Sequence, residues 1–335
     1  MPDRVIVRLP NWLGDTVMAV PALRALRAAW PDARVLAAGP WVSVLAGQGL
    51  ADVLLTYPRA WAGRLRVVDV ARDFRADVAL VLPNSFESAL AARYWRTMRR
   101  VGFAANGRRW LLSDALPLPA PRRHQVDEYL VLAGALGARP VIETPQLVGP
   151  AADAAERREV RAWLDEIGVS ARPRIGVHLG AAYGDAKVWP PARVTEFVRA
   201  ALSRDGSVVL LGPAETGRAA GEIVRTTGAA SLVGRDRPAT LPALLTEIDV
   251  LVAGDTGVAH LAAALGTPVV TLFGPTDPAL SAPRGPSAIV RHAVPCAPCF
   301  YRTCPIDHPC LRGITAGDVV ERVDALVRAR TEALS

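Results

Sequence analysis

Apolar and polar positions follow two alternating patterns along the chain. Short apolar runs are typical of buried strands, and longer stretches with apolar residues every three to four positions are typical of helices. In the first half these patterns predict strands at 4–9, 34–38, 53–56 and 78–82 and helices at 15–30, 85–93 and 125–136. Because strands and helices alternate, the pattern favours an α/β fold with parallel sheets.

The same alternation returns after residues 137–150, a segment rich in proline and glycine that is typical of a domain linker. The second half is predicted to contain strands at 174–178, 208–211, 250–253 and 269–273 and helices at 152–167, 192–204, 215–226, 241–247, 256–265 and 315–330. At about 150 residues per domain, 335 residues correspond to two domains, which we place at 1–150 and 151–335. Two such halves imply a cleft lined by the carboxyl ends of parallel strands.

The composition narrows the class of protein. Hydrophobic residues make up 51% of the chain and charged residues 21%, which excludes global disorder. The net charge of +7 comes almost entirely from arginine, and Lys187 is the sole lysine. Such a surface suits a partner rich in phosphate or an anionic membrane face. Aromatic residues are only 6% and do not interleave with basic runs, so we expect no nucleic-acid partner.

The sequence predicts neither a membrane span nor an export signal. No apolar run of 18 residues is free of charge, and residues 1–5 lead directly into the first predicted strand without a basic leader. We therefore expect a cytoplasmic protein without a transmembrane segment.

The first loop with candidate chemistry joins the strand at 4–9 to the following helix. Gly14 permits close backbone approach, and Asp15 lies at or near the predicted helix start. One interpretation is a helix-capping aspartate, because Asp is a preferred cap. The other is a carboxylate at the mouth of the interdomain cleft that takes a proton from a substrate hydroxyl.

A second loop follows the strand at 250–253. Gly254 and Gly257 open the backbone, Thr256 can cap the next helix, and the free N–H groups of that helix start form an anion site suited to a diphosphate. His260, one turn into the helix, is either part of this site or a satisfied core histidine. The alternative for the whole motif is a capped helix after a buried strand.

The third loop, 178–190, carries Gly180 and the only lysine of the chain. The ammonium group of Lys187 suits contact with phosphate as a compact point charge, and the alternative is a surface lysine. We expect Trp189 to pack and Pro190 to begin the next helix.

Several catalytic classes lack their motifs. The chain has no G-x-x-x-x-G-K-[ST] segment, no G-x-G-x-x-G after the first strand, no H-E-x-x-H and no G-x-S-x-G. These absences argue against a P-loop enzyme, a dinucleotide-dependent dehydrogenase, a zinc protease and a serine hydrolase.

All four cysteines lie in one segment, with the spacing C-x2-C-x4-C-x5-C: Cys296, Cys299, Cys304 and Cys310. Four such ligands can form a tetrahedral zinc site, with His292 and His308 nearby. The alternative is a loop of reduced thiols that packs and orders one face of the protein. Because a second C-x-x-C is missing, we favour reduced thiols and expect no metal.

Together these segments resemble the bacterial ADP-heptose:lipopolysaccharide heptosyltransferases. Residues 11–15 (NWLGD) look like the first-loop signature of that family, and 180–190 is similar to its PGA…KRWP segment. Residues 254–260 with 273–278 (FGPTDP) are similar to its third conserved segment, and the cysteine region resembles the heptosyltransferase II branch. The chain departs from the family at Pro242, where some relatives place a glutamate that contacts the donor ribose.

The resemblance implies a GT-B fold of two Rossmann-like domains that face each other across a cleft, an acceptor-side domain at 1–150 and a nucleotide-sugar-binding domain at 151–335. It implies inverting heptosyl transfer from ADP-heptose to the lipopolysaccharide core, with Asp15 as general base. The donor would be held by the following residues: Lys187, Asp255, Thr256, Gly257 and His260. Gly14, Gly180 and Gly254 would support the loops.

The resemblance also concerns cofactors and location. Because no D-x-D pair is placed to hold a metal–nucleotide complex, we expect transfer without a required cofactor. The acceptor would be the lipid A–core glycolipid at the inner membrane, which suits a cytoplasmic enzyme that is peripheral on the inner face of that membrane.

Two alternatives remain open from the sequence. A related GT-B transferase could use another acceptor, such as a protein or a different polysaccharide. A protein of another class, a non-catalytic basic nucleotide-binding module or a cofactor-dependent oxidoreductase, could share the α/β pattern. The binding module would not need a carboxylate that faces an anion site, and the oxidoreductase would need a nicotinamide-binding fingerprint that the sequence lacks.

Overall fold

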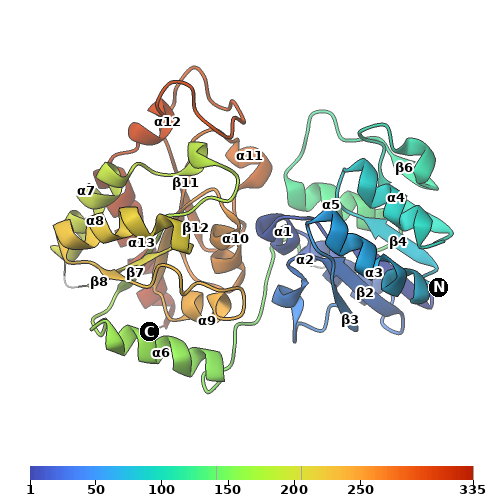
Figure 1. Ribbon diagram of the computed structural model, residues 1–335, viewed down its shortest axis with the longest axis horizontal. Helices are drawn as coiled ribbons and strands as arrows, with labels where there is room; N and C mark the ends of the chain where they lie inside the picture. The colour runs from blue at the N-terminus through green and yellow to red at the C-terminus, as the bar shows by residue number, and fades with distance from the viewer. Residues whose placement is uncertain (141, 205, 335) are drawn as a thin grey trace. The chain divides into compact units, whose positions relative to one another are not determined.

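The computed structural model describes residues 1–140, 142–204 and 206–334, and the chain divides into two compact units, Met1–Val148 and Gly149–Ser335 (Figure 1). Each unit contains one six-stranded sheet whose paired strands are all parallel. Within the described residues, none of the helices combines the length and apolar character needed to span a bilayer.

The first sheet has the strand order β3-β2-β1-β4-β5-β6. Its strands are β1 (Arg4–Arg8), β2 (Arg34–Gly39), β3 (Val53–Thr56), β4 (Val78–Val81), β5 (Arg99–Phe103) and β6 (Asp114–Leu116). The helices of this unit are α1 (Leu13–Met18), α2 (Val20–Ala29), α3 (Trp61–Asp73), α4 (Phe86–Tyr94) and α5 (Gln125–Gly134), with 3-10 turns η1 (Val42–Leu45) and η2 (Arg109–Leu111). This strand order is the Rossmann order, and it changes direction between β1 and β4.

The second sheet has the order β12-β11-β10-β7-β8-β9. Its strands are β7 (Arg174–His178), β8 (Ser207–Leu211), β9 (Ala230–Ser231), β10 (Val250–Gly254), β11 (Val269–Phe273) and β12 (Ser287–Arg291). The longer helices are α6 (Ala155–Glu166), α7 (Pro191–Leu202), α8 (Gly217–Thr227), α9 (Leu241–Thr246), α10 (Gly257–Ala264) and α13 (Ala316–Leu334). Short helical turns complete the unit: η3 (Asp185–Lys187), η4 (Ala214–Thr216), α11 (Pro278–Ser281) and α12 (Pro309–Arg312).

Alternation along the strands divides each core into two layers. Val250 and Val252 of β10 face the helices α7, α8 and α13, where Phe197 and Val320 are buried. Leu251, which points to the opposite face of the sheet, is also fully buried. Burial on both faces is why these strands read as continuous apolar runs in the sequence.

The predicted strands and helices mostly lie where the sequence placed them, and the α/β fold class is confirmed. The helix expected at 15–30 is wrong in one respect, because it is two helices that meet at Ala19. Pro21 in the first turn of α2 lacks the N–H that a continuous helix would need. The sequence also missed α3 and β5, whose many arginines hide their short apolar pattern.

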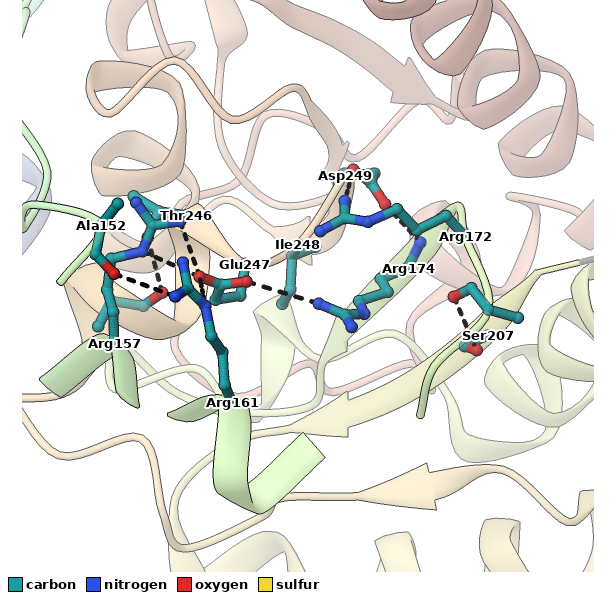
Figure 2. A network of polar contacts seen from close by, with 12 residues as sticks. Ala152, Arg157, Arg161, Arg172, Arg174, Ser207, Thr246, Glu247, Ile248 and Asp249 are labelled. Carbon is teal, nitrogen blue, oxygen red and sulfur yellow. Dashed lines mark hydrogen bonds and ion pairs between the residues drawn. The ribbon is translucent and has the colours of Figure 1, made fainter. Parts of the chain in front are cut away.

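The buried carboxylate of Glu247 helps to hold helix α6, which follows the linker, against the rest of the second unit. Glu247, whose side chain is 5% exposed, accepts hydrogen bonds from Arg157 at 2.7 Å and from Arg161 at 2.9 Å, both on α6 (Figure 2). Arg174 of β7 lies 3.5 Å from the same carboxylate. Burial opposes ionisation of Glu247, but the guanidinium groups of Arg157 and Arg161 outweigh burial and lower the pKa of its carboxyl.

Candidate functional site

The strand order of each sheet predicts where a ligand can bind. In an open parallel sheet the crevice lies beyond the carboxyl ends of the two strands at which the order changes direction. In the second unit these are β7 and β10, which pair directly. A small pocket lies there, lined by Val177, His178, Leu179, Gly180, Lys187, Val188, Trp189, Val194, Val252, Ala253, Gly254 and Leu272. Residues from two of the three candidate loops therefore share one pocket.

Lys187 and Asp255 form the polar centre of this site. The Lys187 Nζ donates to Asp255 Oδ2 at 2.5 Å, and the two side chains are 11% and 5% exposed. The same ammonium group lies 4.6 Å from the centre of the Tyr183 ring. Thr276 Oγ1 donates to the same carboxylate oxygen at 2.7 Å. Lys187 is therefore held in place from several sides, and it is not the solvated surface lysine of the alternative interpretation.

The start of α10 lies beside this pair. Thr256 is the residue before the helix, but its hydroxyl does not cap it: among the described residues Thr256 Oγ1 has no hydrogen-bond partner although it is shielded from solvent. Buried polar atoms are normally paired, so such an atom marks a place where a ligand oxygen can bind. Gly257 begins the helix, and its first-turn N–H groups carry partial positive charge. His260 is buried, with Nε2 3.9 Å from Asp255 Oδ1.

Two glycines allow these loops to approach one another. A Cβ on Gly254 would lie 2.5 Å from the backbone oxygen of Lys187, and a Cβ on Gly180 would lie 2.5 Å from Pro213. Real Cβ atoms do not come so close to other heavy atoms, and a backbone oxygen cannot move cheaply. The predicted role of both glycines as loop supports thus has a steric reason.

The cysteine segment packs against the Lys187 loop. Tyr183 donates its hydroxyl to Phe300 O at 2.6 Å, and Ala186 N donates to Arg302 O at 3.1 Å. The four cysteines are free, and burial raises the pKa of the Cys310 thiol. Across the described part of the chain, no group of three or more His, Cys, Asp or Glu side chains has an arrangement that could hold a metal ion. The segment therefore orders the Lys187 loop through its backbone.

In the first unit the strand order changes between β1 and β4, and Asp15 follows β1. Asp15 lies near the helix start as expected, but it is not the capping residue of the first interpretation. Helix α1 begins at Leu13 after Trp12, so Asp15 lies in the first turn, and Gly14 is buried beside it. Burial, and then the charges of Asp15 and Glu128, raise the pKa of the Tyr129 hydroxyl well above its usual range. The Asp15 carboxylate thus lies near a buried phenol of α5.

A buried guanidinium fixes the loop that leads to Asp15. Arg8, fully buried at the end of β1, donates to Asn11 Oδ1 at 2.8 Å and to the carbonyl of Leu9. Its guanidinium lies 4.6 Å from the centre of the Tyr57 ring, and Glu87 Oε2 is 3.8 Å away. Burial lowers the pKa of Arg8 to about 10, and the Glu87 charge opposes this change. Arg8 therefore ties β1, the Asn11 loop and α4 together.

A second buried guanidinium joins the loops after β4 and β5. Arg108 donates to Ser85 O at 3.1 Å, to Ser88 Oγ at 3.0 Å, to Asn84 Oδ1 at 3.1 Å and to Phe103 O at 2.9 Å. All of these acceptors are neutral, and burial lowers the pKa of Arg108 to about 10. Hydrogen bonds thus connect the loops after β4 and β5, next to β1, the strand that precedes Asp15.

Comparison with protein families settles the class of this molecule. The family model for glycosyltransferase family 9 (heptosyltransferase) matches residues 65–309, which is most of the chain. The chain belongs to glycosyltransferase family 9. It is therefore a glycosyltransferase of the GT-B fold class, and the family resemblance seen in the sequence is confirmed.

Relatives of this family 9 chain match it over most of the length of both chains. It is 30% identical over 297 residues to lipopolysaccharide heptosyltransferase 2 of Salmonella typhimurium, covering 84% of this chain and 85% of the relative. The structure of E. coli ADP-heptose lipopolysaccharide heptosyltransferase II is similar, with a TM-score of 0.81, 27% identity and 98% and 99% of the two chains covered. A family 9 glycosyltransferase from Veillonella parvula has the same fold, with a TM-score of 0.82 at 18% identity and coverage of 98% and 97%. These findings favour heptosyl transfer over the oxidoreductase and binding-module alternatives.

In this family 9 chain, the sequence predicted the two loops that meet at the Lys187–Asp255 pair, but it did not predict several residues that hold them. The sequence pattern marked Thr276 only as part of the 273–278 motif, and it gave neither Arg8 nor Arg108 a role of its own. An arginine at the end of an otherwise apolar strand, as at Arg8, is a signal that could have been used. The neutral partners of Arg108 lie too far apart in the sequence to be foreseen.

Proposed function

We propose that this chain transfers the heptosyl group of ADP-heptose to the lipopolysaccharide inner core with inversion, as a heptosyltransferase of type II. The observation that carries the proposal is the coincidence of the family's motif residues with the crevice between β7 and β10. On this proposal the unit from Gly149 binds the donor, and the unit that contains Asp15 presents the acceptor.

Each donor-side group has a part that follows from its chemistry. The Lys187 ammonium and the first-turn N–H groups of α10 would stabilise the negative charge that grows on the leaving diphosphate. Thr256 Oγ1, buried and without a partner among the described residues, would donate to a phosphate oxygen. Asp255 carries the wrong charge for phosphate contact, and its part would be to aim Lys187. His260 would complete the wall of the donor pocket.

Asp15 would act on the acceptor. Inverting transfer needs one base that removes a proton from the attacking hydroxyl while the bond to the diphosphate breaks on the opposite face of the sugar. The new glycosidic bond forms, ADP leaves, and the proton passes to the Asp15 carboxylate. Arg8 would keep the loop before Asp15 in position through Asn11.

The test is a measurement of ADP release. The purified protein is incubated with ADP-heptose and heptosyl-Kdo-lipid A, and the glycolipid product is followed by mass spectrometry. We expect ADP release and a gain of one heptosyl group, both dependent on the acceptor and both abolished in Asp15→Asn. Hydrolysis of ADP-heptose without a heptosylated product would exclude this acceptor. Transfer from another sugar nucleotide in preference to ADP-heptose would exclude the proposed donor.

A further inference from the structure

Helix α4 buries its small residues and exposes its large apolar ones, which is the opposite of the usual arrangement. Its buried face consists of small side chains: Ser88, Ala89, Ala91 and Ala92. Its large apolar side chains point outward, since Phe86 and Leu90 are each 42% exposed. A surface helix normally buries its large apolar residues and exposes polar ones, so these side chains are not explained by packing within the unit.

A second segment extends this apolar surface. Trp110 of η2 is 68% exposed, and its ring centroid lies 6.1 Å from that of Phe86. Leu90 follows Phe86 by one helical turn and so lies on the same face of α4. Single exposed apolar residues are ordinary, but a contiguous group of large ones marks an interaction surface. We call Phe86, Leu90 and Trp110 the apolar patch.

Exposed arginines flank the apolar patch. Arg93 lies one turn beyond Leu90, and Arg109 precedes Trp110. Carboxylates in this region are already engaged, because Glu87 pairs with Arg64 at 2.8 Å and Asp114 pairs with Arg99 at 3.3 Å. The surroundings of the patch are therefore positively charged, which suits an anionic partner.

The patch lies at the functional edge of the first sheet. Phe86 follows β4 and Asp15 follows β1, and Trp110 contacts Phe86. Because β1, β4 and β5 are parallel neighbours, their carboxyl ends share one edge of the sheet. The Arg108 hydrogen bonds to the β4 loop hold this edge together. An object bound at the patch would thus be close to the loops that follow these strands.

We infer that the apolar patch docks this unit on the surface of an anionic lipid bilayer. Trp110 and Phe86 would enter the interfacial region, where aromatic side chains are most stable, and Arg93 and Arg109 would face lipid phosphates. The inference deepens the proposed function and rests on it. A glycolipid acceptor lies in a membrane, and docking would bring the sheet edge that carries Asp15 close to that acceptor.

Vesicle binding tests the docking without any catalytic step. The full chain is sedimented with vesicles of phosphatidylethanolamine containing 30% phosphatidylglycerol, and with vesicles of phosphatidylcholine alone. We expect binding to the anionic vesicles only, weakened by salt. The pair Phe86→Ser and Trp110→Ser should lower the partition coefficient at least tenfold. The pair Arg93→Gln and Arg109→Gln should lower it about 25-fold, at about fivefold for each arginine near the surface.

A matched variant on the second unit serves as control. Ile306 is 60% exposed and Arg225 is exposed, so Ile306→Ser with Arg225→Gln removes similar groups elsewhere and should bind vesicles like the wild type. All variants change exposed side chains, and their unfolding temperatures should match. Unchanged vesicle binding in both patch variants would overturn the inference, as would equal binding to neutral vesicles. Concentration-dependent dimerisation that Trp110→Ser abolishes, without vesicle binding, would assign the patch to a second copy instead.

Activity separates this inference from the proposed function. With acceptor embedded in anionic vesicles the patch variants should lose at least tenfold in kcat/KM, and with an acyl-free, water-soluble acceptor they should stay within about twofold of wild type. Loss on the soluble acceptor with normal vesicle binding would show that the patch contacts the acceptor sugar and would overturn docking. If wild type and variants release no ADP on either acceptor but differ in vesicle binding, docking stands and the proposed function fails.

Discussion

The Lys187–Asp255 pair makes the sharpest prediction, because its two members should affect ADP binding in opposite directions. Lys187→Met leaves a carboxylate that is 5% exposed, and Asp255→Ala leaves an ammonium group that is 11% exposed. Breaking a buried ion pair typically costs about 3–5 kcal/mol. Neighbouring groups recover part of this: Thr276 still donates to the carboxylate, and the Tyr183 ring still faces the ammonium. We therefore expect about 3 kcal/mol for each single variant.

The double variant K187M/D255A leaves no buried charge at this point. It should lose only about 2 kcal/mol of unfolding free energy, so the two single effects should be non-additive by about 4 kcal/mol. Calorimetric unfolding of the four proteins measures this difference. Glu166→Gln is the control, because its pair with Arg235 lies on the surface of the same unit and should contribute less than about 1 kcal/mol.

ADP binding then decides the role of each partner. A hydrogen bond to a charged group contributes about 1.5–3 kcal/mol, so Lys187→Met should weaken ADP binding by about 10- to 150-fold. Asp255→Ala releases the ammonium for the diphosphate and should preserve or raise the affinity. Isothermal titration with ADP measures both. If both single variants weakened ADP binding equally, Asp255 would itself contact the nucleotide, and its assignment as the group that aims Lys187 would be wrong.

Other predictions concern catalysis, packing, acid stability and the cysteines. Asp15→Asn should fold normally and lose about 10²–10⁴-fold in turnover, measured by ADP release; near-normal turnover would leave Asp15 without a catalytic role. Gly254→Ala should raise the donor KM at least tenfold with little change in acceptor KM, because its Cβ would displace the Lys187 backbone. The lowered pKa of Glu247 means that its stabilising pairs are complete above its unfolded value near 4.5 and are lost as pH falls through the folded pKa. Glu247→Gln should thus lower the unfolding temperature at pH 7 and flatten its fall toward pH 3. Elemental analysis of untagged protein should find no stoichiometric zinc; about one zinc per chain would contradict the expectation of reduced thiols.

The fold was predictable where burial on both faces produced an unbroken apolar run. The strands at 174–178 and 269–273 were placed to the residue, because their interior positions are buried at both sheet faces; Thr271, the one polar interior position of the second strand, is itself fully buried. Strand β5 was missed since its first two residues are arginines, Arg99 and Arg100, whose side chains reach backbone carbonyls instead of solvent alone. An arginine at a strand end can thus face solvent or bond to backbone carbonyls, and the sequence pattern alone does not separate these two cases.

The meeting of the loops after β7 and β10 was predictable for a related reason. In a parallel sheet, every loop after a strand reaches the same edge, so residues at 180–187 and 254–257 had to meet once β7 and β10 were neighbours. What the sequence did not contain was the pairing itself: the contact of Lys187 with Asp255 needs Gly254 to let the two backbones approach to contact distance. The absence of a side chain at Gly254 therefore allows the ammonium of Lys187 to reach the carboxylate of Asp255.

The buried arginines show how the same residue type serves two ends in this chain. Arg8 and Arg108 lie below the rim of the first sheet, where burial lowers their pKa values to about 10 and where carbonyl, amide and hydroxyl oxygens accept hydrogen bonds from them, with Glu87 near Arg8. Leaving such a guanidinium without its partners would cost several kcal/mol, so these loops are held in one arrangement. Arg93 and Arg109, on the exposed surface, hold no part of the fold in this way. The net charge of +7 therefore includes buried arginines that hold loops in place and exposed arginines that act on the surroundings of the protein. Only the exposed arginines can attract an anionic membrane.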